Sequence, residues 1–198
     1  MLLLLHGIGS NERDMAALAP FLDPRLVVLS VRSPLPIGPD AYAWFRVAFT
    51  PHGPVVDAEQ AAQGLELLPR FARAAAAAYG ADARRVYVAG FSQGGIMALG
   101  GLLTAPETFA GAIMMSGRLP DEVLERAAPP QRLRGKGVLV LHGTQDATLP
   151  VAHGRAARER LERLPVDLTY REFEMGHTVS LPSLQFAARW LAQELDRA

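Results

Sequence analysis

Short apolar runs alternate with longer amphipathic stretches along the whole chain, and this alternation restricts the available folds most. The apolar runs, which we expect to be strands, cover residues 2–5, 26–31, 85–89, 111–115, 137–141 and 168–173. The amphipathic stretches, which we expect to be helices, cover residues 11–22, 57–79, 94–104, 150–164 and 180–197. This alternation is typical of βαβ units and a parallel sheet. Because most runs are continuously apolar, we expect helices on both faces of the sheet.

Two proline-rich segments interrupt the alternation. Residues 33–54 contain five of the fifteen prolines, and residues 117–136 contain three more. We interpret both as surface excursions beside the sheet, where functional loops tend to lie. No linker divides the chain, and its 198 residues are an ordinary length for one domain. We therefore expect a single domain over residues 1–198.

The composition argues against several classes of function. Twenty Lys and Arg residues balance twenty Asp and Glu residues, so no net charge would attract nucleic acid or an anionic membrane surface. The absence of cysteine removes disulfides, thiol catalysis and cysteine zinc sites. The opening apolar run stops at His6 and has no basic region, so we expect no signal peptide and no membrane span. We expect a soluble, cytoplasmic protein.

The motif Gly90-Phe91-Ser92-Gln93-Gly94 has the pattern G-x-S-x-G and lies directly between a predicted strand and a predicted helix. In that context the pattern is typical of a nucleophile elbow, a sharp turn that exposes the serine above the start of a helix. Glycine is needed on both sides because a Cβ atom there would collide with the neighbouring strand or helix. The alternative is a glycine-rich turn in which Ser92 only caps the helix.

A serine nucleophile needs a base, and the base needs an acid that orients it. In a strand–turn–helix context both are expected after Ser92, in the order acid and then histidine. Asp146 follows the predicted strand 137–141 closely, whereas Asp121 and Asp167 do not follow a predicted strand so closely. We therefore predict that Asp146 is the orienting acid. The alternative is a turn or cap residue before the next helix.

Three histidines follow Ser92 in the sequence, namely His142, His153 and His177. We expect His142 to pack at the end of a strand, and His153 lies within a predicted helix. His177 lies in the loop between the last predicted strand and the last predicted helix, where an imidazole can reach over the sheet. We predict that His177 is the base, with a solvated loop histidine as the alternative. A base must be neutral, so activity should fall below pH ~6–7.

The oxyanion of an acyl-transfer intermediate needs hydrogen-bond donors. We predict the backbone N–H groups of Gln93, directly after the serine, and of Ile8, in the glycine-rich turn at residues 5–9. The alternative for this turn is an ordinary connection between a strand and a helix. The chain has no G-x-G-x-x-G and no P-loop pattern, which argues against nucleotide binding. Its histidines lack metal-site spacing, so we expect no metal and no cofactor.

Together these motifs resemble those of the α/β-hydrolases, and more narrowly those of the phospholipase/carboxylesterase family of carboxylesterases and acyl-protein thioesterases. The resemblance covers nearly the whole chain and rests on residues 5–9, Trp44-Phe45, residues 90–95, His142-Gly143 with Asp146, and Gly176-His177. It implies a catalytic triad of Ser92, Asp146 and His177, an oxyanion hole formed by Ile8 and Gln93, and a small-molecule ester substrate. It also implies a minimal fold of about six mostly parallel strands, since the chain starts at the third strand of the usual fold.

The sequence departs from the family where relatives often carry Trp-Phe-Asp, because here Arg46 follows Trp44 and Phe45. Four of the fourteen aromatic residues lie close together in this segment: Tyr42, Trp44, Phe45 and Phe49. We predict that they form an apolar wall for the substrate, with Trp44 and Phe45 as binding residues. The alternative is that these rings only cover the edge of the sheet. Residues 117–136 are a second candidate border of the pocket, and a lid there is a further hypothesis.

The expected activity is hydrolysis of carboxylic esters with small to medium acyl chains, through an acyl-enzyme intermediate. Thioester hydrolysis and lysophospholipase activity are alternatives that the same triad can carry out. A binding module that keeps the fold without catalysis is a more remote alternative, because a fold alone does not establish activity. A homodimer is also a hypothesis, with no particular surface assigned to it.

Overall fold

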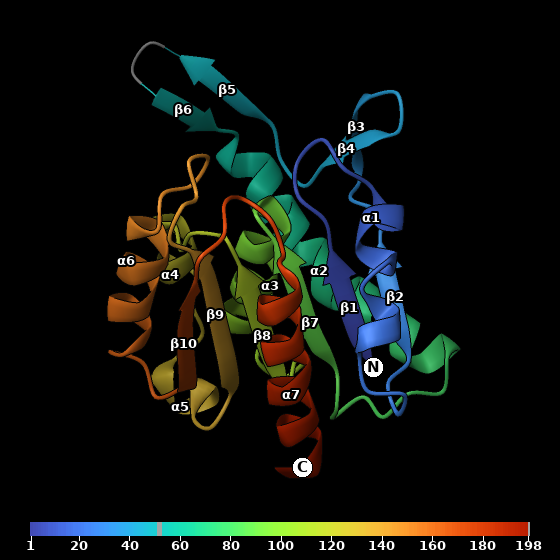
Figure 1. The fold of residues 1–198 in the computed structure, drawn as a ribbon. Helices are drawn as coiled ribbons and strands as arrows, with labels where there is room; N and C mark the ends of the chain where they lie inside the picture. The colour runs from blue at the N-terminus through green and yellow to red at the C-terminus, as the bar shows by residue number, and fades with distance from the viewer. Residues whose placement is uncertain (51–52, 198) are drawn as a thin grey trace.

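The computed structural model describes residues 1–50 and 53–197, and its centre is a sheet with helices on both faces (Figure 1). The strand order is β10-β9-β8-β7-β1-β2, and all neighbouring strands are parallel. The strands are β1 Leu2–Leu5, β2 Val28–Val31, β7 Tyr87–Phe91, β8 Gly111–Met115, β9 Gly137–Gly143 and β10 Asp167–Phe173. The predicted α/β class with six parallel strands is therefore confirmed.

Two hydrophobic clusters lie on opposite faces of the sheet. Leu3 and Leu5 of β1 belong to one cluster, and Leu2 and Leu4 belong to the other, because successive side chains of a strand point to opposite faces. The first cluster includes residues of α2 (Ala58–Ala78), α3 (Gln93–Thr104) and α6 (Ala152–Leu161). The second includes residues of α1 (Glu12–Ala16) and α7 (Leu181–Arg197). Burial on both faces explains why the strands are continuously apolar.

Four predicted helices differ from the structure only at their ends, but the prediction of a helix over residues 11–22 is wrong in its second half. The helix α1 ends at Ala16, and a short 3-10 helix follows at Ala19–Phe21. Pro20 explains the break, because proline has no N–H group and its ring clashes with the carbonyl group four residues earlier in an α-helix. The chain therefore turns here instead of continuing one long helix.

The described part of residues 33–54 leaves the central sheet, as predicted, but it is more regular than its prolines suggest. These residues contain the hairpin of β3 (Leu35–Gly38) with β4 (Ala41–Ala43) and the strand pair β5 (Val47–Thr50) with β6 (Gly53–Val56). A proline such as Pro36 is compatible with a two-stranded hairpin because both strands are edges. Both strand pairs stand beyond the carboxyl ends of the central strands (Figure 1). For Phe49, the structure describes its place in β5 but not its side chain.

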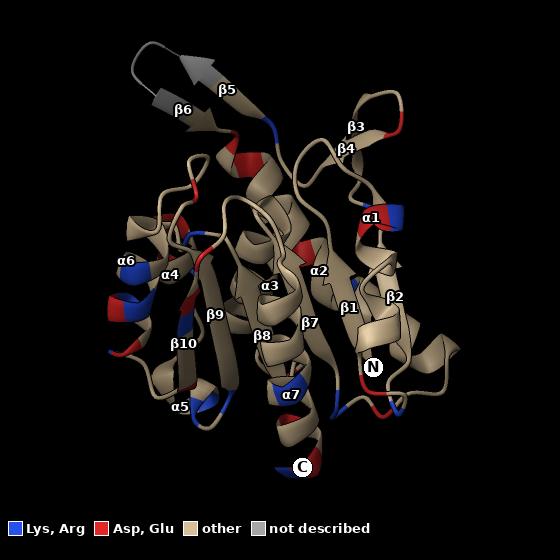
Figure 2. Cartoon of the chain, in the orientation of Figure 1, with Lys and Arg blue, Asp and Glu red and all other residues tan. Residues whose placement is uncertain are grey.

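The second proline-rich segment contains two short helices, α4 Asp121–Glu125 and α5 Pro130–Leu133. A short helical piece near residues 121–127 agrees with the amphipathic pattern there. Charged side chains lie mainly on helices and loops, while most of the central sheet is uncharged (Figure 2). No helix within residues 1–50 and 53–197 is both long and apolar enough to cross a membrane.

Candidate active site

Ser92 lies in a sharp turn between β7 and α3. Its φ is 53° and its ψ is −118°, a conformation that few residues other than glycine adopt without strain. A Cβ atom on Gly90 would lie 2.1 Å from the carbonyl oxygen of Gly94, and one on Gly94 would lie 2.1 Å from that of Leu5. Neither position can therefore hold a side chain, which is the physical reason for the two glycines of the motif.

Ser92, His177 and Asp146 form a continuous chain of polar contacts. Nε2 of His177 lies 3.0 Å from Oγ of Ser92, and Nδ1 of His177 lies 2.7 Å from Oδ2 of Asp146. The three residues follow β7, β10 and β9, whose carboxyl ends share one edge of the sheet. The ring of Phe91 packs against the imidazole of His177 with centroids 4.7 Å apart. The imidazole is thus held between a hydroxyl group and a carboxylate, as a base that activates a nucleophile must be.

The carboxylate of Asp146 is buried and its oxygens are well supplied with donors. Oδ1 accepts hydrogen bonds from the backbone N–H groups of Thr148 and Leu149, at 3.0 and 2.8 Å. Burial alone would raise the pKa of Asp146, but the hydrogen bonds from His177, Leu149 and Thr148 outweigh it and leave the pKa below its usual value. Asp146 is therefore ionised at neutral pH, and a carboxylate on this side keeps the proton of His177 on Nδ1.

His142 is completely buried beside the same carboxylate, which confirms that it packs at the end of a strand. Its Nε2 lies 2.8 Å from the carbonyl oxygen of Leu149 and 3.6 Å from Oδ2 of Asp146. Because a carbonyl oxygen only accepts, Nε2 carries the proton and donates it to Leu149. Its Nδ1 has no partner among the described residues. The contact with Asp146 was not predicted from the sequence, although the spacing of four residues, from the end of β9 into the following turn, was a usable signal.

The backbone around Ile8 and Gln93 lies directly against the turn of Ser92. A Cβ atom on Gly7 would lie 3.3 Å from Cβ of Ser92, so the turn after β1 touches the elbow. Gln93 is the first residue of α3, and the first N–H groups of a helix have no partner within it. Neither the N–H group of Ile8 nor that of Gln93 donates a hydrogen bond to another described residue. Both groups are therefore available to a ligand.

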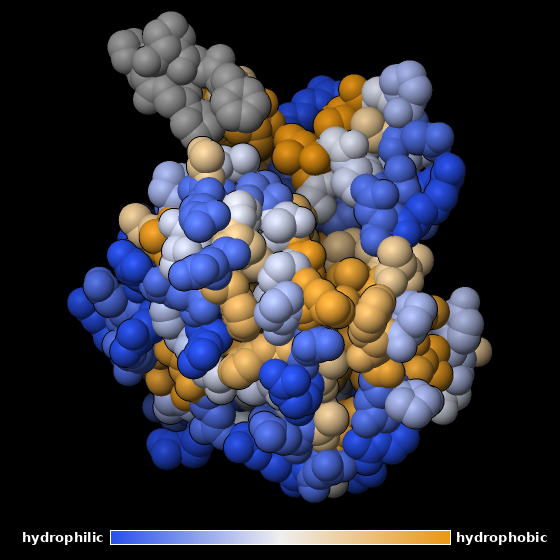
Figure 3. Space-filling view, viewed as in Figure 1, coloured by the Kyte–Doolittle hydropathy of each residue, from blue (hydrophilic) through white to orange (hydrophobic). Residues whose placement is uncertain are grey.

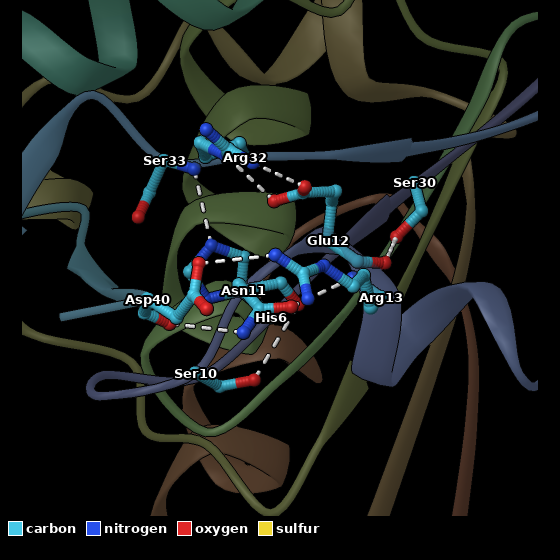
Figure 4. Close-up of polar contacts among 9 residues, drawn as sticks. All are labelled: His6, Ser10, Asn11, Glu12, Arg13, Ser30, Arg32, Ser33 and Asp40. Carbon is cyan, nitrogen blue, oxygen red and sulfur yellow. Dashed lines mark hydrogen bonds and ion pairs between the residues drawn. The ribbon is translucent and has the colours of Figure 1, made fainter.

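His6 holds the turn after β1 in place from inside. Its ring is completely buried, and Nδ1 lies 2.7 Å from the carbonyl oxygen of Gly7. Nε2 accepts the backbone N–H of Ser33 at 3.1 Å (Figure 4). This pair of contacts requires a neutral ring with its proton on Nδ1. Burial lowers the pKa of His6 below its usual value, which agrees with a neutral ring.

A second group of polar contacts holds the β3–β4 hairpin against α1 (Figure 4). Nδ2 of Asn11 donates to the carbonyl oxygen of Asp40 at 2.9 Å, and the guanidinium of Arg13 pairs with the carboxylate of Asp40 at 3.0 Å. The backbone of Tyr42 exchanges two further bonds with the turn after β1, to Gly9 and Ser10, both at 2.9 Å. The hairpin and the turn that carries Ile8 are therefore one connected unit.

The two predicted binding residues, Trp44 and Phe45, belong to the same hydrophobic cluster, but only Phe45 also lines a cavity. Both are buried. The indole of Trp44 packs in the core, and its Nε1 donates to the carbonyl oxygen of His6 at 3.0 Å. Phe45, in contrast, lines an apolar cavity together with Ile96 and Met97 of α3. Phe45 is thus positioned to contact a ligand, whereas Trp44 joins the segment to the turn after β1.

Two hollows flank the elbow. One is a groove that contains Ser92 and His177 and is otherwise lined mainly by Gly7, Ile8, Met15, Leu18, Phe91 and Val179. The other is the cavity beside Phe45, with a volume of about 530 Å³ that includes open solvent at its mouth. Hydrophobic side chains gather between the two hairpins above the sheet (Figure 3). No cluster of three metal-binding side chains occurs in the described part of the chain.

The chain is similar to known proteins over nearly its whole length. The family model described as Phospholipase/Carboxylesterase matches residues 1–195. The esterase YpfH of Escherichia coli is 30% identical over 94% of this chain and 79% of its own length. The probable carboxylesterase Os04g0669600 of Oryza sativa subsp. japonica is 28% identical over 98% of this chain and 88% of its own length. The crystal structure of the Bacillus cereus carboxylesterase has a TM-score of 0.81 and 26% identity over 98% of this chain and 88% of that chain.

Proposed function

The chain belongs to the phospholipase/carboxylesterase family of α/β-hydrolases, and we propose that it is a serine carboxylesterase that forms its acyl-enzyme on Ser92. One observation carries the assignment of residues, namely the contacts of His177 with Ser92 at 3.0 Å and with Asp146 at 2.7 Å. In the proposed mechanism Oγ of Ser92 attacks the ester carbonyl carbon while Nε2 of His177 accepts the hydroxyl proton. Asp146 holds the imidazole in the required tautomer and stabilises the imidazolium.

The tetrahedral intermediate carries a negative charge on the former carbonyl oxygen. In our proposal this oxyanion accepts hydrogen bonds from the backbone N–H groups of Ile8 and Gln93. The bond to the alcohol oxygen then breaks, and His177 gives its proton to the leaving alcohol. A water molecule attacks the acyl-enzyme through the same base, which releases the carboxylic acid and restores the hydroxyl group of Ser92.

We further infer, from the position of His177, which hollow holds which half of an ester. Because His177 must protonate the leaving oxygen, the alcohol lies on the side of the groove that His177 lines. The acyl chain then extends toward the cavity beside Phe45. The lining of this cavity is mostly apolar and includes Phe45, Ile96 and Met97, which supports an acyl chain there.

The test is hydrolysis of a series of chromogenic esters from acetyl to palmitoyl by the wild type and by Ser92→Ala. We expect hydrolysis that depends on Ser92 and is fastest for small or medium acyl chains. A folded wild type with no serine-dependent rate on any ester would overturn the proposal and favour a non-catalytic module. Faster hydrolysis of thiol esters than of matched oxygen esters would favour the thioesterase alternative, and a maximum at palmitoyl would favour a lipid substrate.

Three hypotheses about the whole molecule need separate measurements. We propose that residues 1–198 form one domain, which requires a single cooperative unfolding transition that is the same by circular dichroism and by fluorescence. A cytoplasmic location is tested by fractionation of the source cells. A homodimer is tested by sedimentation of the purified protein at several concentrations.

A further inference from the structure

Arg118 is a partly buried arginine without an acidic partner. It lies in the loop after β8, and within the described part of the chain its side chain takes part in no hydrogen bond and no ion pair. The nearby carboxylate of Asp121 is already paired with Arg160 at 2.7 Å. Arg118 is of intermediate burial and keeps part of its surface in contact with solvent. A guanidinium in this state is therefore available to an anionic ligand.

Arg118 lies close to the nucleophile. A Cβ atom on the preceding residue, Gly117, would lie 3.3 Å from the carbonyl oxygen of Ser92. Consecutive Cα atoms are about 3.8 Å apart, so Cα of Arg118 lies within roughly 9 Å of that oxygen. The side chain of Arg118 also lines the cavity beside Phe45 and Ile96. Arg118 therefore lies near the elbow and also lines the cavity.

The charges around the cavity favour an anion. Most of its wall is apolar, and its three charged residues are Arg118, Glu122 and Arg126. Glu122 and Arg126 are exposed on or next to α4, whereas Arg118 is partly shielded from solvent. No ion pair joins Glu122 to either arginine in the described structure. Shielding strengthens the interaction of a charge with a ligand, so of these three charges Arg118 is the one with which we expect a ligand to interact most strongly.

We propose that Arg118 binds a carboxylate at the far end of the acyl chain, so that the enzyme prefers monoesters of dicarboxylic acids to esters of neutral fatty acids of the same length. This inference rests on the proposed function, because it places the acyl group on the side away from His177. A planar guanidinium pairs with a carboxylate through two parallel hydrogen bonds. The apolar wall beside Phe45 would contact the methylene groups between the ester and the free carboxylate.

The test compares monoethyl adipate with ethyl hexanoate, which have the same chain length and release the same alcohol. Ethanol release gives kcat/KM for both esters on one preparation of wild type, and Ser92→Ala gives the background. We expect the wild type to prefer the adipate. We expect Arg118→Met to lower the ratio of adipate to hexanoate by about tenfold or more, since a hydrogen bond to a charged group contributes about 1.5–3 kcal/mol. Arg118→Lys should lower it less.

Two control variants make the result specific. Arg163 is exposed and lies outside both hollows, so Arg163→Met removes the same charge and should leave the ratio unchanged. Arg126→Met tests whether any positive charge at the mouth of the cavity is enough to produce the preference for the adipate. An equal loss of the ratio in Arg126→Met and Arg118→Met would overturn the assignment to Arg118, because it would indicate a diffuse potential that salt screens.

The remaining outcomes separate the inference from the proposed function. Serine-dependent hydrolysis with no preference for the adipate, or with a ratio that Arg118→Met leaves unchanged, would overturn the inference alone. Hexyl acetate and 6-acetoxyhexanoate form a second pair, in which the free carboxylate is at the far end of the alcohol part instead of the acyl part. A carboxylate preference confined to that pair would overturn the placement on the acyl side. Absence of serine-dependent hydrolysis for all four esters would remove the proposed function and the inference together.

Discussion

Oε1 of Gln93 accepts the backbone N–H of Trp44 at 2.8 Å, which ties the start of α3 to the segment between the hairpins. The same side chain donates from Nε2 to the carbonyl oxygen of Phe45 at 2.7 Å. Gln93 therefore has two separable parts, a backbone N–H group beside Ser92 and a side chain that holds the wall of the cavity. The indole of Trp44 continues the connection to the turn that carries Ile8. One buried glutamine thus links both proposed oxyanion donors.

Replacement of this glutamine should weaken both stability and activity. Gln93→Leu keeps the backbone N–H group but leaves the backbone groups of Trp44 and Phe45 without partners in a buried place. We expect a loss of about 1–3 kcal/mol in the free energy of unfolding, measured by urea denaturation, together with a lower kcat. Gln63→Leu on the exposed face of α2 is the control. Unchanged stability in Gln93→Leu would contradict the role that these contacts assign to the side chain.

His142 should matter although it does not touch Ser92. His142→Phe fills a similar volume but leaves the carbonyl oxygen of Leu149 without its donor, and it removes the imidazole nitrogen that lies 3.6 Å from Oδ2 of Asp146. We expect a lower kcat with a smaller change in KM, and a loss of about 1–3 kcal/mol in unfolding free energy. His153→Phe is the matched control, because His153 lies outside the contacts of Asp146. Equal kcat values for wild type and His142→Phe would exclude this positioning role.

The buried, neutral state of His6 makes stability depend on pH. Burial holds the pKa of His6 below its usual value, so the unfolded chain takes up a proton at higher pH than the folded chain does. The stabilisation is therefore complete above about pH 6.5 and decreases as the pH falls from there toward the folded pKa. Urea midpoints measured at pH 8, 6 and 5 should show this loss. His6→Gln should have a smaller slope, and an identical slope would refute the assignment.

Gly94 should tolerate no side chain. In Gly94→Ala the new Cβ atom would lie 2.1 Å from the carbonyl oxygen of Leu5, so the backbone of α3 or of β1 must shift. We expect a loss of about 1–3 kcal/mol or more in unfolding free energy and a large loss of activity. Gly38→Ala is the matched control, because its Cβ atom would only reach the Cβ atom of Ala41 at 3.6 Å. Thermal unfolding and ester hydrolysis of the two variants give the comparison.

The sequence predicted the central sheet well because burial on both faces produces apolar runs with clear ends. Gly111–Met115 was predicted without error, and Leu2–Leu5 likewise. The arrangement of Ser92, Asp146 and His177 was predictable for a related reason. Parallel strands place all their carboxyl ends at one edge, so residues far apart in the sequence meet there. The G-x-S-x-G motif and the parallel topology together were sufficient to predict that these three side chains lie close together.

The features that sequence reasoning missed depend on contacts between segments. The hairpins between residues 33 and 54 are stabilised by pairing with each other and by contacts such as Asp40 with Asn11, and no local pattern encodes them. The prolines there suggested irregular structure, although a two-stranded hairpin tolerates them at its edges. The unpaired state of Arg118 could not be predicted either, since it depends on Asp121 being engaged by Arg160. The hydrogen bonds of the Gln93 side chain to the backbone of Trp44 and Phe45 were likewise not predicted.

The strand order has a consequence for how the chain is made. β1 lies between β2 and β7, and its residue Leu2 pairs with Val28 on one side and Tyr87 on the other. During synthesis the edge of β1 that pairs with β2 can be covered early. The edge that pairs with β7 stays open until β7 has left the ribosome. Until then a strand of four leucines keeps an open, apolar edge, which is a site for aggregation. Closure of this edge therefore depends on a segment, Tyr87–Phe91, that is made much later than the strand it covers.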